Sequence, residues 1–385
     1  MAIRIKRFTG LRFAFLCGFL LILSACGGGS DGTNPPSTSS VANSANLSSS
    51  VASISSASSM SLSSTSSATS STQSSSSASS LTNSERMNAA TQTAQTNNYC
   101  LAIRPFYWEI GDQNSALVSG SVGGTTFTAN TDMPIASASK WVFGAYIAQL
   151  HGGQLTAEDI SALTMSSGYT NFNEVSCIRL LQSTQDAETV NDCFQSSSAN
   201  GGKNSDYQAD NLNHFYYNGG HFQNLAVNLG LGSLNNASLQ AAVQAQLGTD
   251  FSFTYGTPQL AGGVNTTAAN YAIFLRKIIN NQLAIHDLLG QHKVCTQLSS
   301  CPTAVYTPAP ANESWNYSLG HWVENDPANG DDTFSSPGAF GFYPWIDKTK
   351  TYYGVLARKS DPGSGFESVY CGRLIRKAWV TGVVQ

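Results

Sequence analysis

The stretch Pro134-Ile-Ala-Ser137-Ala-Ser-Lys140, with the mostly apolar run that follows it, predicts the start of a helix. Apolar side chains recur there at three-to-four-residue spacing, which places them on one face of a helix. If Ser137 begins this helix, Lys140 lies one turn further along the same face. A serine hydroxyl becomes nucleophilic when a base takes its proton, and a desolvated lysine can be that base. Ser137 and Lys140 are therefore candidate catalytic residues, and a capped helix with a surface lysine is the alternative.

The composition limits the kind of partner this chain can have. Its 385 residues carry a formal net charge of -4, and the sequence pI is near 5.8. This balance gives no electrostatic case for binding nucleic acid. The length leaves room for one large domain beside a leader and a linker. We expect a monomer that needs no cofactor.

Residues 1–26 predict a secretion leader. Four basic residues stand within the first twelve positions, and the apolar segment at 13–23 is too short to span a bilayer comfortably. The leader ends in Leu23-Ser-Ala-Cys26, which resembles the bacterial lipobox. That resemblance implies a lipid on Cys26 and, because glycine follows it, anchoring to the outer membrane, facing the periplasm or the cell exterior. An ordinary cleaved signal with an incidental cysteine is the alternative.

Residues 27–96 consist mainly of serine, threonine, alanine, asparagine and glycine, with few large apolar side chains. Such a segment cannot bury enough apolar surface to fold, so we expect a disordered tether. The folded domain is predicted over 97–385.

The folded part has strand-like segments at both ends and helical segments between them. A β-hairpin is predicted over 101–121, and further strands over 316–324, 339–347 and 351–358. An amphipathic helix is predicted over 267–281 and a closing helix over 366–380. The fold class is therefore α+β, with an antiparallel sheet built from both termini, flanked by helices, and a mostly helical inserted subdomain.

The cysteines indicate an oxidising compartment. Apart from one in the leader and Cys26, six remain: Cys100, Cys177, Cys193, Cys295, Cys301 and Cys371. Six cysteines allow fifteen pairings. Short loops favour the two local disulfides Cys295–Cys301 and Cys177–Cys193, which leaves Cys100 to pair with Cys371. Metal binding by these cysteines is not expected, because no C-x-x-C pair occurs.

Acyl transfer would need a second proton carrier and an oxyanion hole beside Ser137. Tyr216 is the candidate for the proton, and the Asn218 amide for holding a substrate carbonyl. Two adjacent tyrosines, at 216 and 217, are more often packing residues, which is the alternative. His221 and its neighbour His214 are expected to be structural rather than metal ligands.

A third element, Ser336-Pro-Gly338-Ala339, leads into a predicted strand. Its glycine lets a substrate approach backbone N–H groups closely. The N–H groups of Ser137 and Ala339 could together face a developing oxyanion.

The order of these elements resembles the serine β-lactamase and penicillin-binding-protein family, particularly its class C β-lactamase, D,D-peptidase and esterase branch. Ser137-Ala-Ser-Lys140 matches its first motif and Tyr216-Tyr-Asn218 its second, while Ser336-Pro-Gly338 stands in place of Lys-Thr-Gly or His-x-Gly. Ala261-Gly-Gly and Tyr317-Ser-Leu-Gly-His-Trp also resemble conserved family elements. The resemblance covers most of residues 100–385 and implies a β-lactamase/transpeptidase-like fold.

The resemblance implies a two-step mechanism in which Ser137 forms an acyl-enzyme and water then releases the acyl group. Lys140, helped by Tyr216, would take the serine proton. The family's third motif begins with a cation that helps to hold a substrate carboxylate, and Ser336 replaces it. A small-molecule ester therefore fits better than a β-lactam or a cell-wall peptide, unless Arg358 or Arg373 supplies the charge.

We therefore expect an extracytoplasmic serine hydrolase, most simply an esterase, acting on a small ester or amide. The alternatives are a β-lactamase or D,D-peptidase, and a non-catalytic lipoprotein that uses the same fold for binding.

Overall fold

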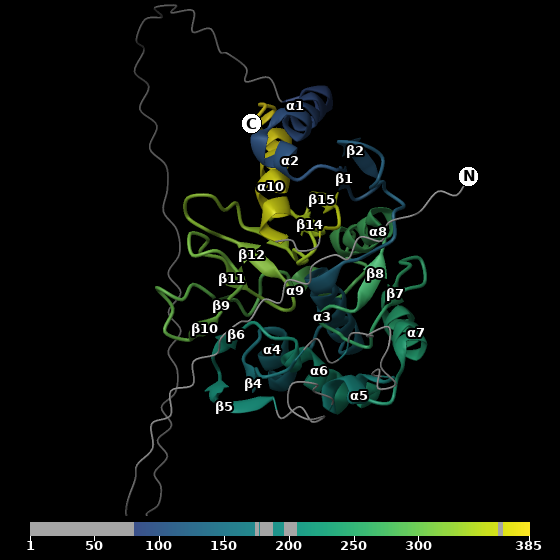
Figure 1. Ribbon diagram of the computed structural model, residues 1–385, viewed down its shortest axis with the longest axis vertical. Coiled ribbons are helices and arrows are strands. Elements are labelled where there is room, and N and C mark those ends of the chain that lie inside the picture. Colours follow the sequence, from purple (N-terminus) through teal and green to yellow (C-terminus); the bar gives the residue numbers. More distant parts are fainter. Residues whose placement is uncertain (1–80, 174–176, 178–187, 196–205, 361–364) are drawn as a thin grey trace, which may run out of the picture. The chain divides into compact units, whose positions relative to one another are not determined.

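The computed structural model describes residues 81–385, except 174–176, 178–187, 196–205 and 361–364 (Figure 1). The predicted leader with Cys26 and the tether residues 27–80 lie outside the described residues. None of the described helices is long and apolar enough to cross a membrane.

Short strands and helices alternate along the described chain. The strands are β1 Phe106–Asp112, β2 Ala116–Val122, β3 Met133–Pro134, β4 Ser167–Tyr169, β5 Tyr207–Leu212, β6 Phe215–Tyr216, β7 Thr254–Tyr255, β8 Val264–Thr266, β9 Val294–Cys295, β10 Ala304–Tyr306, β11 Asn316–Tyr317, β12 Trp322–Glu324, β13 Thr333–Ser335, β14 Tyr343–Ile346 and β15 Tyr352–Ala357. The helices are α1 Asn83–Thr96, α2 Asn98–Ala102, the 3₁₀ turn η1 Ala136–Ala138, α3 Ser139–Leu150, α4 Ala157–Leu163, α5 Val190–Gln195, α6 Gly220–Ala226, the π-helical turn η3 Val227–Leu231, α7 Asn236–Leu247, α8 Ala268–Ile279, α9 Ile285–Leu288 and α10 Gly365–Thr381.

One eight-stranded sheet joins the two ends of the described chain. Its order is β2-β1-β15-β14-β13-β12-β11-β9, and each pair of neighbours is antiparallel. The first two strands come from the N-terminal side and the other six from the last third of the chain. This confirms the predicted α+β class and the predicted sheet built from both ends.

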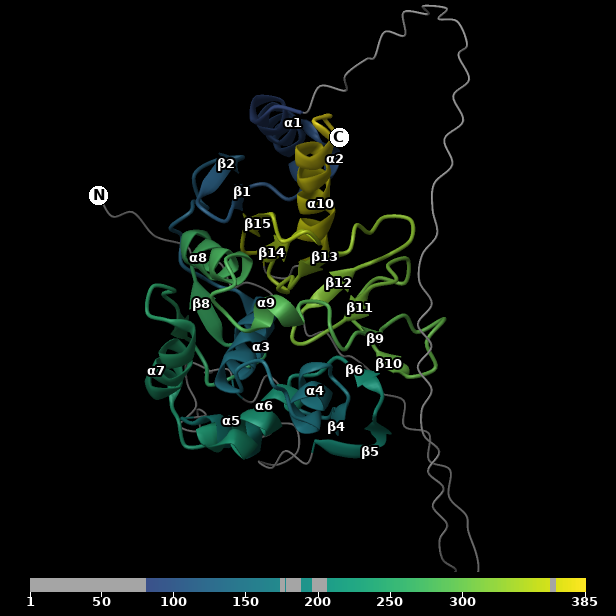
Figure 2. The same cartoon turned by 180° about the vertical axis from the view of Figure 1, so that it is seen from behind.

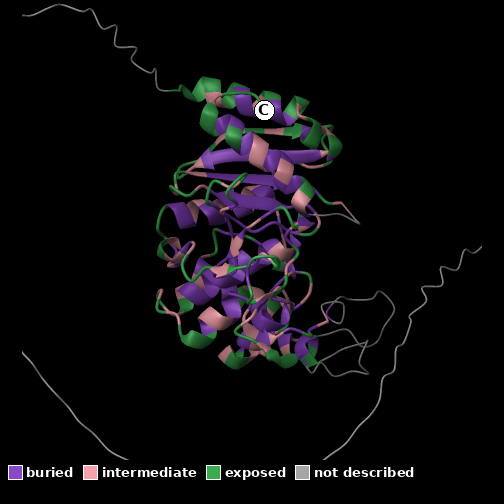
Figure 3. Ribbon diagram, turned by 90° about the vertical axis from the view of Figure 1, so that its left-hand side faces the viewer, coloured by how far each residue is buried: buried purple, intermediate pink, exposed green. Residues whose placement is uncertain are grey.

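The two faces of the sheet are covered by different helices. Neighbouring residues on a strand point to opposite faces. Tyr352 packs against Trp379 of α10, while the next residue, Tyr353, accepts a hydrogen bond from Arg276 of α8. The sheet therefore lies between α10 and α8, and its inner strands are buried, whereas the edge strands β2 and β9 are partly exposed (Figure 3).

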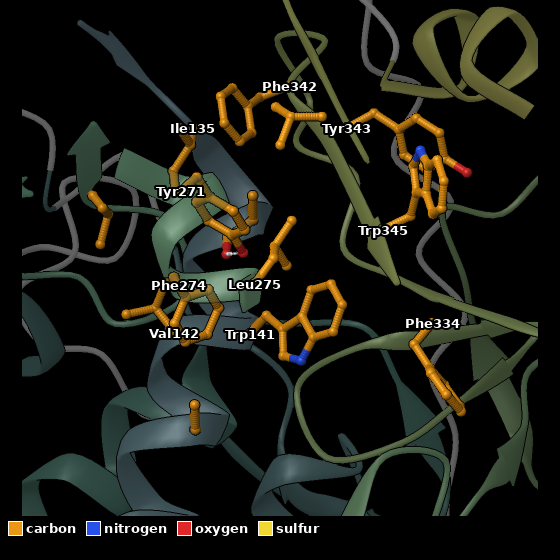
Figure 4. Close-up of a cluster of buried hydrophobic side chains, with 14 of the residues drawn as sticks. Ile135, Trp141, Val142, Tyr271, Phe274, Leu275, Phe334, Phe342, Tyr343 and Trp345 are labelled. Atoms are coloured by element: carbon orange, nitrogen blue, oxygen red, sulfur yellow. Dashed lines mark hydrogen bonds between the residues drawn. The ribbon is translucent and has the colours of Figure 1, made fainter. Parts of the chain in front are cut away.

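The segment between β2 and β9 forms the predicted helical insertion. Helices α4, α5, α6 and α7 lie at the end of the molecule opposite to α1 and α10 (Figures 1 and 2). Helix α3 runs from the sheet into this helical part and is buried through most of its length, as the mostly apolar run after Lys140 requires. Its Trp141 meets Phe274 of α8 edge to face (Figure 4).

The folded domain begins earlier than predicted. Helix α1 occupies the last part of the segment assigned to the tether, and Thr82 with Glu85 forms a capping box at its start. Alanines rather than large side chains make its buried face, which includes Ala90 and Ala94. Arg86 also donates to the backbone oxygen of Trp379 in α10, at 2.8 Å. The prediction failed because small side chains let two helices pack closely without any large apolar residue.

Two strand predictions also need correction. The segment predicted as the start of the first strand is helix α2, capped by the Asn97 side chain. The segment 316–324 is two strands, β11 and β12, because Gly320 adopts a positive φ of 81° between them. The helix predicted over 267–281 is α8, capped by Thr267, and the closing helix is α10.

All three predicted disulfides are present. Cys177–Cys193 and Cys295–Cys301 close local loops, and Cys100–Cys371 joins α2 to α10 across 271 positions of sequence. The long-range bond links the same two ends of the described chain that build the sheet.

Candidate active site

Ser137 and Lys140 lie in contact at the start of α3. The Lys140 Nζ atom is 3.0 Å from the Ser137 Oγ atom. Ser137 lies in the 3₁₀ turn η1 rather than in the helix itself, which begins two residues later. Side chains three positions apart eclipse one another in a 3₁₀ turn, so this geometry brings the two together.

Lys140 is buried, with 2% of its surface exposed. Its Nζ atom also donates to the backbone oxygen of Ala261, at 2.9 Å. Among the described residues, no carboxylate lies within ion-pair distance of this amine. Ala261 belongs to the Ala-Gly-Gly element quoted from the sequence, although the sequence alone does not predict that its carbonyl contacts Lys140.

The residue before Ser137 is strained. Ala136 has a φ of 45°, in the left-handed region that residues with a side chain rarely adopt. Such strain persists only where the surroundings determine the backbone, and it concentrates at functional sites. Here it coincides with the turn that presents Ser137.

Three neighbouring elements hold this turn. Strand β8 bonds to it through Val264, whose carbonyl accepts from the Ile135 N–H and whose N–H donates to Ser139 Oγ. The Tyr271 hydroxyl of α8 donates to the Ala138 oxygen, at 2.9 Å. Figure 4 shows Ile135 and Tyr271 within this buried cluster.

Ser336, in the third sequence element Ser336-Pro-Gly338-Ala339, also holds this turn. Its side chain is buried, and its hydroxyl donates to the backbone oxygen of Ser137 at 3.0 Å. The backbone of Gly338 lies so close to Ile135 that a Cβ atom at position 338 would overlap the Ile135 carbonyl oxygen. Ala339 is exposed and lines the cleft in front of Ser137. Of the three residues predicted to bind substrate here, only Ala339 faces the cleft.

The second motif is placed differently from the prediction. The ring of Tyr217, not Tyr216, lies beneath the Lys140 amine, with Nζ 4.7 Å from the ring centre. Tyr217 lines the cleft, whereas Tyr216 does not, and the Tyr216 ring packs instead on Tyr306 at 5.2 Å. Neighbouring residues of β6 and its extension point to opposite sides, so only one of the two tyrosines can face Lys140.

Asn218 lines the cleft as predicted, but its amide also supports the surrounding wall. Its Nδ2 atom donates to the Phe172 oxygen at 3.2 Å, and its Oδ1 atom accepts from the Gly220 N–H at 2.8 Å. An amide nitrogen has two hydrogens, so one remains for a substrate.

His221 is fully buried directly behind the second motif. Its Nδ1 atom accepts from the Ser167 N–H, and its Nε2 atom lies 3.0 Å from the Tyr216 oxygen, to which it donates. Burial lowers the pKa of this imidazole to about 4. The ring is therefore neutral near pH 7 and acts as a structural link between β4 and β6.

These elements surround a cleft of about 520 Å³. Its lining residues share a neutral, largely aromatic character: Ser137, Phe172, Asn173, Tyr217, Asn218, Tyr306, Pro308, Trp322, Pro337, Ala339, Gly365 and Phe366. Tyr217 and Trp322 belong to elements quoted from the sequence, whereas Phe172, Tyr306 and Phe366 carry no motif and join them only through the tertiary fold.

Neither arginine considered as a substitute cation lines the cleft. Arg358 pairs with Glu367 and also donates to Ser368. Arg373 forms a bidentate pair with Glu313. Neither arginine therefore supplies the positive charge that the family's third motif has at the position of Ser336.

Neither a protein-family model nor a curated protein matches this sequence. The D-amino acid amidase of Ochrobactrum anthropi SV3 is similar in structure, with a TM-score of 0.53 and 10% identity over 75% of this chain and 99% of that one. The octameric penicillin-binding protein homologue of Pyrococcus abyssi gives 0.51 and 12%, over 78% and 76%. A D-stereospecific amidohydrolase from Streptomyces gives 0.50 and 12%, over 79% and 100%.

At these identities the likeness concerns the fold. The neighbours and the chain share a mixed architecture of helices and antiparallel sheet, as the motifs in the sequence led us to expect. The chain therefore has the fold of the serine β-lactamase and penicillin-binding-protein family.

Proposed function

We propose that this chain is a serine hydrolase that works through an acyl-enzyme on Ser137 and that its substrates are esters. The observation that carries the proposal is the 3.0 Å contact between Lys140 Nζ and Ser137 Oγ beside an open cleft. This distance is within reach for direct proton transfer.

In the first step, Ser137 Oγ attacks the ester carbonyl carbon while its proton passes to the Lys140 amine. The carbonyl π electrons move to oxygen, and the oxyanion is stabilised by the N–H groups of Ser137 and Ala339. Among the described residues, the Ala339 N–H has no backbone acceptor. When the tetrahedral intermediate collapses, the alkoxide leaves with the proton from Lys140, and the acyl group stays on Ser137.

In the second step, water attacks the acyl-enzyme carbonyl and gives a proton to Lys140. Collapse of this intermediate returns that proton to Ser137 Oγ and releases the carboxylic acid. The ring of Tyr217 favours the transient ammonium, because an aromatic face attracts a cation.

The neutral cleft supports an ester rather than a β-lactam or a peptide carboxylate. None of its described lining residues is charged, and Arg358 and Arg373 are both paired with glutamates. A substrate carboxylate brought into this cleft would lose hydration without gaining a cationic partner among the lining residues.

Intact-mass spectrometry of the full chain tests the proposal. The chain would be incubated separately with p-nitrophenyl butyrate, a fluorophosphonate and a penicillin. We expect acyl and phosphonyl adducts with the first two reagents that disappear in Ser137→Ala. Ser115→Ala is the control, because Ser115 is exposed in the turn between β1 and β2, away from the cleft. A penicillin adduct would indicate a β-lactamase or D,D-peptidase, and no adduct with any reagent would indicate a binding protein.

We also propose that Cys26 carries a lipid and that the segment after it tethers the domain to the outer membrane. The basic start, the short apolar core and Leu23-Ser-Ala-Cys26 support this proposal. Expression with a labelled fatty acid should label the full chain but not Cys26→Ala. Equal labelling of both proteins would contradict it.

A further inference from the structure

We propose that the cleft holds a neutral aromatic ring of the substrate, so that the preferred esters carry a planar aryl group beside the scissile bond. This inference rests on the proposed ester hydrolysis and names the substrate class for that same site.

The first observation is the concentration of aromatic side chains around Ser137. Five of the twelve lining residues are aromatic, whereas aromatic residues make up 10% of the whole chain. They are Phe172, Tyr217, Tyr306, Trp322 and Phe366. Because they come from five separate places in the sequence, no local packing requirement explains why they converge on one cleft.

The second observation is that the rings are fixed in orientation. Tyr217 and Trp322 stack on each other at 5.4 Å with planes 24° apart. Tyr306 packs on Tyr216 behind it, at 5.2 Å and 37°. Tyr306 is 48% exposed, so a flat substrate group can meet this preformed ring without reordering it.

The two remaining rings are backed in the same way. Phe172 packs on Phe194, at 6.4 Å and 33°, beside the Cys177–Cys193 disulfide. Phe366 packs on Trp315, at 5.2 Å and 40°. Thus every aromatic residue of the cleft has another ring as its support.

The strand that carries Tyr306 is tied directly to the second motif. Strand β10 pairs with β6, and the Tyr306 carbonyl accepts from the Tyr217 N–H at 3.0 Å. The Cys295–Cys301 disulfide lies just before β10 and links it to the edge strand β9. This wall is therefore held rigidly next to the residues that surround Lys140.

The size and charge of the cleft further limit which ligands can bind there. A volume of about 520 Å³ is within the range of sites for small organic molecules. The lining residues that the structure describes are uncharged, so they favour a neutral group over a carboxylate or an ammonium ion. A benzoyl or benzyl ester meets both requirements.

The test compares each aromatic ester with a saturated ester of similar size. Methyl benzoate against methyl cyclohexanecarboxylate places the ring on the acyl side, and benzyl acetate against cyclohexylmethyl acetate places it on the alcohol side. We expect kcat/KM to favour the aromatic member by about tenfold in one of the two pairs, because stacking requires a flat face. The pair that shows the preference identifies the side of the ester that the rings hold.

Tyr306→Leu should reduce this preference at least threefold, while Tyr207→Leu should leave it unchanged. The two tyrosines are closely matched: Tyr306 is 48% exposed and packs on Tyr216 at 5.2 Å, and Tyr207 is 46% exposed and packs on Tyr169 at 5.3 Å. Only Tyr306 lines the cleft.

Equal rates within both pairs, with hydrolysis still dependent on Ser137, would overturn the aromatic site and leave the proposed function intact. If no ester is cleaved, binding of benzyl acetate and cyclohexylmethyl acetate to Ser137→Ala, measured by ligand-observed NMR, decides the inference by itself. Equal dissociation constants would then overturn it.

Discussion

The amine of Lys140 lies over the face of the Tyr217 ring, with Nζ 4.7 Å from the ring centre. The same nitrogen contacts Ser137 Oγ and the Ala261 oxygen. One buried amine therefore contacts a serine hydroxyl, a carbonyl and an aromatic face. This places Tyr217, rather than its neighbour Tyr216, beside the atoms that would exchange a proton.

Replacing Tyr217 should harm acylation more than replacing Tyr216. A cation over a desolvated ring is stabilised by roughly 2 kcal/mol, so Tyr217→Leu should slow acylation about 30-fold. Tyr216→Leu should change the rate less than threefold, because that ring packs on Tyr306 outside the cleft. Stopped-flow acylation by p-nitrophenyl butyrate measures both. A larger loss in Tyr216→Leu would restore the role predicted from the sequence.

Gly338→Ala should disrupt the site by steric overlap. The added Cβ would overlap the Ile135 carbonyl oxygen, two residues before Ser137, and force the third element away from the nucleophile turn. We expect a loss of at least 2 kcal/mol in unfolding free energy, as for overpacking in a rigid core, and at least tenfold lower kcat/KM.

Gly120→Ala is the control for the Gly338 substitution. The nearest atom to a Cβ there is 3.5 Å away, an ordinary contact, so both quantities should change little. Denaturant unfolding and ester hydrolysis measure the two effects. A Gly338→Ala protein with wild-type values of both would show that the close approach to Ile135 is unimportant.

His221 should make the protein less stable in acid. Burial lowers its pKa to about 4, below the ordinary value of 6.5, so the folded state favours the neutral ring. The stabilisation is complete above pH 6.5 and is lost as the pH falls towards 4, because the unfolded chain binds the proton more readily. The loss amounts to roughly 3 kcal/mol. His221→Gln should remove that part of the slope when unfolding is followed from pH 7 to 4, and an unchanged slope would contradict the assignment.

Asp206 should have the opposite pH dependence. Burial raises its pKa to about 7, and its Oδ2 atom has no hydrogen-bond partner among the described residues. The folded state therefore keeps the proton that the unfolded chain releases above about pH 4, so stability falls as the pH rises from 4 to 7. Asp206→Asn removes this titration. The gain in unfolding free energy of the variant over the wild type should therefore be larger at pH 8 than at pH 4, by a few kcal/mol. If the wild type and the variant respond equally to pH, Asp206 is ionised in the fold.

The sequence predicts the contacts that are local and misses those that depend on distant segments. Ser137 and Lys140 are three positions apart, so the geometry of a single turn brings them together. Which tyrosine faces Lys140 depends on the pairing of β6 with β10, about ninety positions further along the chain. No local pattern contains that information.

The same distinction applies to the fold. Alternating and helical apolar patterns predict the sheet and α8, because large side chains mark the buried face. Helix α1 escapes prediction because its buried face is made of alanines, which do not differ in composition from the tether before it. The aromatic cleft also escapes prediction, since Phe172 and Tyr306 become neighbours of Ser137 only through the fold.

The pairing of α1 with α10 makes the described chain nearly circular. Gly382 lies against the Leu81 side chain, and the Gln385 N–H donates to Thr93 of α1. A linker that runs along most of α1, on the order of 18 Å, could join these two ends, and new termini could be opened in the exposed turn at Gln113 between β1 and β2. The same cleft would then form from strands that follow one another in a different order along the chain. The domain is therefore a candidate for circular permutation.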